Sequence, residues 1–184
     1  MSTQDLFGGN NIDDFIENRQ KDLLAEIDRQ GESIFGISSD ELTERLVRKF
    51  RLEVPVLKTG SNEIKIDHHE HEKGLAVMFS VPFEGDPTVL RLASRFSPSV
   101  PSASIINNEI RFSYMTYNYD QETLLNNFRN DLRNVEECFK RNSTQISSYN
   151  ASISEWIQER INARKQKLEK DKKFIASLGF PLKK

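Results

Sequence analysis

The stretch that decides the fold is "LLNNFRNDLRNVEECFKRNSTQISSYNASISEWI", residues 124–157. Apolar side chains recur along it in steps of three and four, the spacing of one face of a coiled-coil helix. We call these residues the helical stripe; its members are Leu125, Phe128, Leu132, Val135, Phe139, Asn142, Ile146, Tyr149, Ile153 and Trp156. Only Asn142 among them is a polar amide. The pattern predicts long helices in the C-terminal third of the chain.

The stripe continues beyond Trp156 after a shift of one residue. Its later members are Ile157, Ile161, Leu168, Ile175 and Leu178, and no glycine or proline interrupts residues 120–178. The run "NSTQISSYNAS", residues 142–152, is rich in side chains that compete with helical backbone bonds. A single bent helix of about 57 residues is one interpretation. We expect two long helical segments instead, with a junction near Ser147.

The N-terminal zone, residues 11–52, also has helical spacing. Asn11 precedes an apolar-periodic run whose first turn is acidic, as a helix N-cap would. A second helix is expected to open at "SSDEL", where Ser38 and Glu41 have the spacing of a capping box. These residues therefore predict at least two helices before the first strand.

Residues 53–119 show the alternation of β-strands. "ASIINNEIRFSYMTYNY" predicts a hairpin around Asn107 and Asn108, since asparagine tolerates positive φ in a tight turn. "TVLRLAS", residues 88–94, is expected to be a further strand. Short links between strands imply an antiparallel sheet.

We therefore expect an α+β fold: an antiparallel sheet of about five to six strands packed by N-terminal helices, followed by long C-terminal coiled-coil-like helices. The α+β core spans residues 1–119, with helices in 11–52 and strands in 53–119. Residues 120–184 form the long helical segment, and the two parts are expected to make one folded unit.

The segment "LGFPLKK", residues 178–184, predicts a specified boundary. Gly179 is placed to end the helix as its C-cap residue, and Pro181 prevents the helix from resuming. Phe180 and Leu182 are expected to pack back on the helix end. Residues 179–184 thus mark a specified C-terminal boundary of the helical segment.

Composition limits the class of protein. The chain has 184 residues and a net charge of −2, but residues 1–53 carry 7 basic and 12 acidic side chains whereas residues 158–184 carry 9 basic and 3 acidic ones. The single cysteine, Cys138, cannot form an internal disulfide and indicates a reducing cytoplasm. No apolar run is long enough to cross a membrane, so no membrane partner is expected.

The sequence contains no catalytic motif that we recognise, so we expect neither enzymatic activity nor a cofactor. Cys138 lies far in sequence from every histidine, and an inert thiol is expected. "DHHEHEKG" places Asp67, His69 and His71 on one face of an extended segment, a weak candidate metal set. We interpret it instead as a solvated hairpin turn, because no second cluster supplies further ligands.

Two surfaces are candidates for binding. The first is a protein interface on the helical stripe, formed by Leu132, Val135, Phe139, Asn142, Ile146, Tyr149, Ile153 and Trp156. The second is a basic helix face that could contact nucleic acid through Arg160, Arg164, Lys167 and Lys170. A protein contact, including one with the acidic N-terminal helices, is the favoured role of this basic face.

Two stretches together resemble an uncharacterised N-terminal module of bacterial multidomain proteins. They are "VPFEGDPTVLRLASRFSPSVPSASIINNEIRFSY" and "SYNASISEWIQERINARKQKLEKDKKFIASLGFPLKK". In that module an "LGFPL" exit leads to an effector-like domain, and such proteins resemble components of defence against phage. The resemblance implies a non-catalytic regulatory or assembly module that mediates protein–protein interaction or oligomerisation. A small nucleic-acid-binding protein is the alternative.

Overall fold

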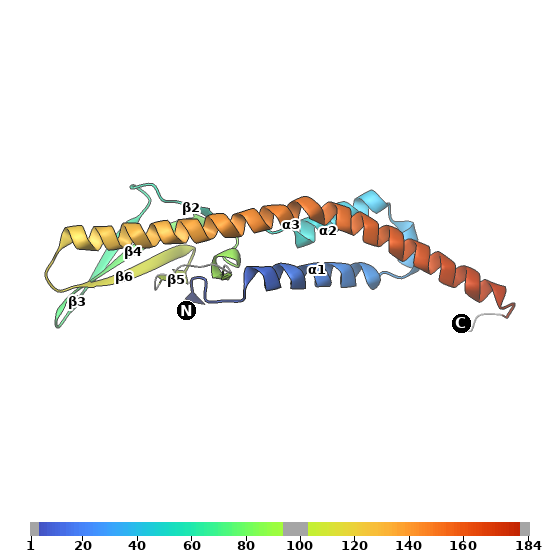
Figure 1. Ribbon diagram of the computed structural model, residues 1–184, viewed down its shortest axis with the longest axis horizontal. Coiled ribbons are helices and arrows are strands. Elements are labelled where there is room, and N and C mark those ends of the chain that lie inside the picture. Colours follow the sequence, from blue (N-terminus) through green and yellow to red (C-terminus); the bar gives the residue numbers. More distant parts are fainter. Residues whose placement is uncertain (1–3, 94–102, 181–184) are drawn as a thin grey trace. The chain divides into compact units, whose positions relative to one another are not determined.

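The chain folds as an α+β protein in a computed structural model that describes residues 4–93 and 103–180 (Figure 1). The elements are, in order, β1 (Gln4–Asp5), α1 (Ile12–Asp28), the 3-10 helix η1 (Glu32–Gly36), α2 (Ser39–Phe50), β2 (Val56–Leu57), β3 (Lys65–His71), β4 (Gly74–Glu84), the 3-10 helix η2 (Val89–Arg91), β5 (Ala103–Ile106), β6 (Glu109–Thr116) and α3 (Gln121–Ser177). The predicted antiparallel sheet, N-terminal helices and long C-terminal helix are confirmed. The expectations for Pro181 and Leu182 concern residues outside the described part.

The contacts divide the chain into two compact units. The first unit comprises residues 1–15 and 53–147, and the second comprises residues 16–52 and 148–184. This partition crosses the division at residue 120 expected from the sequence, because α3 contributes to both units.

The sheet of the first unit is antiparallel. In the described residues its strand order is β1-β5-β6-β4-β2, with β3 also paired to β4. The β5–β6 hairpin turns at Asn107 and Asn108, whose φ angles of 48° and 62° confirm the predicted tight turn. The register places Phe79 opposite Phe112 and Val81 opposite Ile110. Large apolar side chains on neighbouring strands therefore lie on one face of the sheet.

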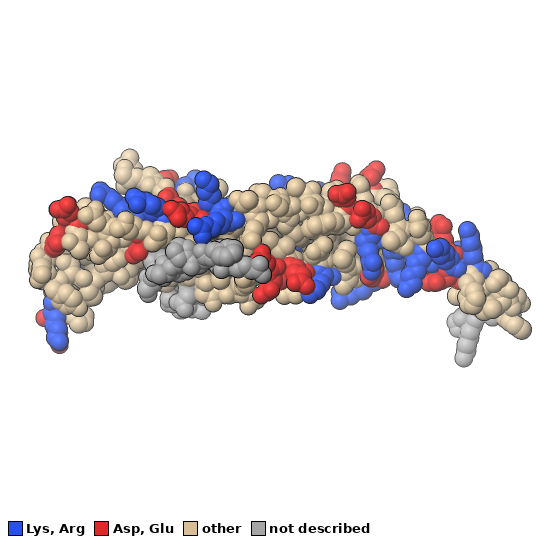
Figure 2. Space-filling model, viewed as in Figure 1, with Lys and Arg blue, Asp and Glu red and all other residues tan. Residues whose placement is uncertain are grey.

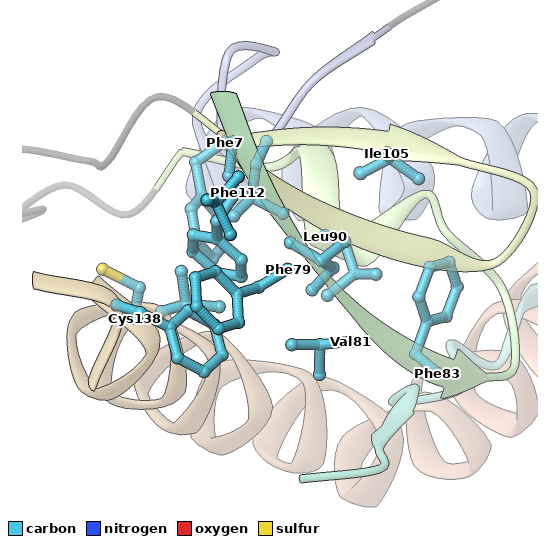
Figure 3. Packing of buried hydrophobic residues seen from close by; sticks show 14 residues of the cluster. Phe7, Phe79, Val81, Phe83, Leu90, Ile105, Phe112 and Cys138 are labelled. Atoms are coloured by element: carbon cyan, nitrogen blue, oxygen red, sulfur yellow. The ribbon is translucent and has the colours of Figure 1, made fainter. Parts of the chain in front are cut away.

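The first part of α3 covers that face. Phe128, Val135 and Cys138 belong to the same buried cluster as the inward residues of the strands (Figure 3). Phe79 and Phe128 stack with ring centroids 4.1 Å apart. No residue of α1 or α2 is among the described members of this cluster. The prediction that N-terminal helices pack the sheet is therefore wrong: helical periodicity identifies an apolar face but not the surface that the face covers.

α3 runs for 57 residues without interruption. The predicted junction near Ser147 is therefore wrong, and the single-helix interpretation holds. Ser143 donates its hydroxyl to the Phe139 carbonyl at 2.7 Å, and Thr144 donates to Lys140 at 3.1 Å. These hydroxyls bond back along the helix instead of ending it.

The second unit contains most of α1, all of η1 and α2, and the later part of α3. Ser38 caps α2 by accepting a hydrogen bond from the Glu41 backbone nitrogen at 3.1 Å, as predicted. The Tyr149 hydroxyl donates to the Phe50 carbonyl at 3.2 Å, and the Asn150 side chain bonds both backbone groups of Leu52. The end of α2 is thus tied to α3 by side-chain hydrogen bonds.

Two local expectations near the start of the sheet have different outcomes. Asn11 accepts a hydrogen bond from the Asp13 backbone nitrogen at 2.8 Å, which confirms its capping role. The segment 88–94 is not a strand over its described residues: it forms η2 and a single bridge between Ala93 and Asn11. The Leu90 nitrogen donates to the Pro87 carbonyl at 3.0 Å, so a 3-10 turn of three residues replaces the expected extended backbone. Within the described residues, no helix is both long enough and apolar enough to cross a membrane.

Candidate interaction surface

The candidate metal residues lie on the edge strand β3 and not in a turn. All seven residues of β3 are exposed, and the turn follows at Glu72 and Lys73. Asp67 and His69 share a face, with His69 Nε2 3.8 Å from Asp67 Oδ2. The extended geometry of Asp67 and His69 was predicted correctly. The turn was predicted within this segment because the segment is polar, but it lies just after it. In the part of the chain that the structure describes, no group of three metal-ligating side chains is arranged around one point.

Most of the candidate interface on the helical stripe is buried by the chain itself. Val135, Asn142 and Ile146 are fully buried, and Tyr149 and Ile153 are at most 3% exposed. Leu132, Phe139 and Trp156 are half-buried. Side chains that are buried within the chain cannot contact a partner. The helical stripe therefore serves mainly as part of the hydrophobic core. Asn142 donates to the Leu92 carbonyl at 3.0 Å, which explains a polar residue in this position.

The candidate nucleic-acid residues fall into two groups. Arg160 forms a two-pronged ion pair with Asp28, its Nε lying 2.8 Å from Asp28 Oδ1. Arg164 donates to the Gln30 carbonyl at 3.0 Å. Lys167 and Lys170 are exposed. The contact predicted between the basic helix and the acidic N-terminal helices thus exists within the second unit, and it occupies both arginines.

The last turns of α3 have no covering element among the described residues. We call residues 167–180 the α3 end. Every residue from 169 to 180 is exposed. Four large apolar side chains are among them: Phe174 (65% exposed), Ile175 (40%), Leu178 (53%) and Phe180 (82%). Gly179 has φ 72°, which confirms its predicted C-cap conformation. Phe180 was expected to pack on the helix end, but its side chain is 82% exposed. The α3 end is therefore the exposed continuation of a stripe that is buried upstream.

The α3 end also has a groove and several exposed lysine side chains. The groove has a volume of about 440 Å³ and is lined by Glu32, Leu168, Asp171, Lys172, Ile175, Ala176 and Phe180. Figure 2 shows basic side chains gathered along this part of α3, with uncharged surface at its tip. The sequence signal was present, since apolar spacing continues to Leu178, but only the structure shows that the described residues from 169 to 180 are all exposed.

A second cavity lies where β6 meets the start of α3 in the first unit. It has a volume of about 250 Å³, and Tyr114, Tyr117 and Asp120 are among its lining residues. The Tyr114 hydroxyl donates to Asp131 at 2.7 Å. Burial, together with the hydrogen bond and charge of Asp131, raises the pKa of Tyr114. This phenol therefore stays protonated at neutral pH and is a hydrogen-bond donor, not a base.

Comparison of the chain with protein-family models, curated proteins and solved structures finds no match.

Proposed function

We propose that the chain is a non-catalytic assembly module that binds another protein through the α3 end. The observation that carries this proposal is the exposure of four large apolar side chains within one short segment at the end of α3. Clustered apolar surface of this kind marks interaction sites, since isolated exposed apolar residues are normal but clusters are not. The cytoplasm is the proposed location, and a role in bacterial defence rests on the sequence resemblance alone.

Helix-to-helix packing is the proposed mode of binding. Leu168, Ile175 and Leu178 keep the spacing of a coiled-coil seam beyond the region that the chain covers itself. Burying a leucine or phenylalanine side chain contributes about 1.5–3 kcal/mol, so a partner that covers this segment gains substantial free energy. The proposed function requires neither a metal nor a cofactor, as expected from the sequence.

Photo-crosslinking at the α3 end tests the proposal. Phe174 replaced by p-benzoylphenylalanine should give a discrete protein adduct in the cells that naturally make the chain, because the probe lies in the docking surface. The matched control is the same probe at Tyr119, an exposed aromatic residue of the first unit that is 72% exposed. Adding Leu178→Asp should remove the Phe174 adduct. Equal adducts from both positions, or none from Phe174, would contradict the proposed function.

Nucleic-acid binding is the second candidate function. Lys167, Lys170 and the pair Lys172 and Lys173 are exposed, and no ion pair engages them among the described residues. If each neutralises one phosphate of a duplex, the logarithm of the association constant should fall with that of salt with a slope of about −3.6. Fluorescence anisotropy with labelled duplex DNA and single-stranded RNA measures this slope. The absence of binding at low salt would reject the candidate.

A further inference from the structure

We infer that the partner of the α3 end is an acidic amphipathic helix, an inference that rests on the proposed function. Its apolar ridge would lie against Ile175 and Leu178, with one large side chain entering the groove beside Leu168. Its carboxylates would face the lysines of the α3 end. Three observations support an acidic helix as the partner. They are the lining of the groove, the exposed lysines of the α3 end and the contact that α3 makes with the acidic helix α1.

The groove fits a side chain of a protein. Leu168, Ile175, Ala176 and Phe180 supply apolar walls, and its volume of about 440 Å³ exceeds that of a single large side chain. Phe180 is 82% exposed, so an occupant would cover it without displacing another group in the described structure. The groove therefore offers apolar burial at a place that is already concave.

The positive charge around the groove favours a negatively charged partner. Residues 167–173 contain four lysines against Glu169 and Asp171. None of the four lysines takes part in an ion pair among the described residues, and all are exposed. Carboxylates placed opposite them would gain charge-assisted hydrogen bonds, and the orientation of a docked helix would follow from where those carboxylates lie.

The same helix already binds an acidic helix a few turns earlier. α1 carries six acidic and two basic side chains. Its last residue, Asp28, pairs with Arg160, and the backbone just after it receives Arg164. Lys165 then donates to Ser39 of α2 at 3.0 Å, and Glu32 of η1 lines the groove. From residue 169 to residue 180 every described residue is exposed. The partner would thus continue a contact that α1 begins.

Two other occupants fit less well. A second copy would have to offer its acidic α1, but Leu23 and Ile27 on the apolar side of α1 are fully buried. Two α3 ends would bring like charges together. An anionic membrane suits the lysines, but the groove of about 440 Å³ is concave and fits a single side chain better than a broad lipid surface.

The test measures binding of designed helices to the purified full chain. The probe is a fluorescent synthetic helix of about 18 residues with leucine at helical spacing and glutamate elsewhere; its partner probe has lysine in place of glutamate. The glutamate helix should bind and the lysine helix should not. The triple variant Lys170→Glu, Lys172→Glu and Lys173→Glu should weaken binding of the glutamate helix at least about ten-fold and favour the lysine helix. Ile175→Ser should also weaken it.

The matched control keeps the net charge of that triple variant. Lys65→Glu, Lys73→Glu and Lys140→Glu reverse three exposed lysines of the first unit, and binding should be unchanged. Equal loss in both triple variants, equal binding of both helices, or capture by phosphatidylserine vesicles without binding of the glutamate helix would overturn the inference. A protein adduct at Phe174 without glutamate-helix binding would overturn the acidic-helix inference alone. The absence of any adduct would overturn the proposed function.

Discussion

Replacing Phe128 with alanine should lower the free energy of unfolding of the first unit by about 3–5 kcal/mol. Phe128 is 6% exposed and is the aromatic anchor of α3 on the sheet. Its ring stacks on Phe79 at 4.1 Å and meets the edge of Phe112 at 5.5 Å. Alanine would remove both ring contacts and leave a cavity that the paired strands cannot close without breaking their register.

Urea unfolding followed by circular dichroism measures this loss. Phe174→Ala is the matched control, because it removes the same ring from the same helix at a position that is 65% exposed. The control should change the free energy of unfolding by less than about 0.5 kcal/mol. Similar effects of the two substitutions would show that Phe128 does not hold α3 on the sheet.

Local signals in the sequence predicted the features that neighbouring residues determine. Asn107 and Asn108 adopt the positive φ of the predicted hairpin turn, and Ser38 caps α2. Gly179 ends α3 in the left-handed conformation expected of a C-cap glycine. Each of these depends on backbone sterics or on a hydrogen bond within four residues, so no distant part of the chain can change it.

The continuity of α3 depended on distant contacts and was therefore mispredicted. Serine, threonine and asparagine near Ser147 lower helix propensity by a few tenths of a kcal/mol each. Two polar side chains of this stretch form tertiary bonds in the structure: Gln145 donates to Asp13, and Asn150 pairs with Leu52. These bonds offset the propensity cost, but their partners lie about a hundred residues or more away.

The candidate interface on the helical stripe was also predicted only in part, because its burial depends on distant residues. Apolar spacing predicted that Val135 and Ile153 would be covered, but spacing alone cannot distinguish cover by the same chain from cover by a partner. In the structure Val135, Ile153 and Ile161 are enclosed within the chain, whereas Ile175 and Leu178 are exposed.

Replacing Ile157 with aspartate should destabilise the second unit by more than about 4 kcal/mol, the largest effect we expect. Ile157 is fully buried at the position where the helical stripe shifts by one residue. Aspartate would lose the apolar burial and would place a carboxylate at a fully buried position of the second unit, whose buried side chains also include Leu23, Ile27 and Ile153. Burial of an unpaired charge is costly because no cation replaces its hydration.

Hydrogen exchange measured peptide by peptide locates this effect. Protection in α1 and α2 should fall in Ile157→Asp, whereas protection in β4 and β6 should persist, since those strands belong to the first unit. Gln158→Asp is the control: it introduces the same residue at an exposed neighbouring position of α3, so it isolates burial from helix propensity. Equal loss of protection in β4 and β6 would mean that the two units unfold together. In that case the continuous α3, which contributes to both, would couple their stabilities.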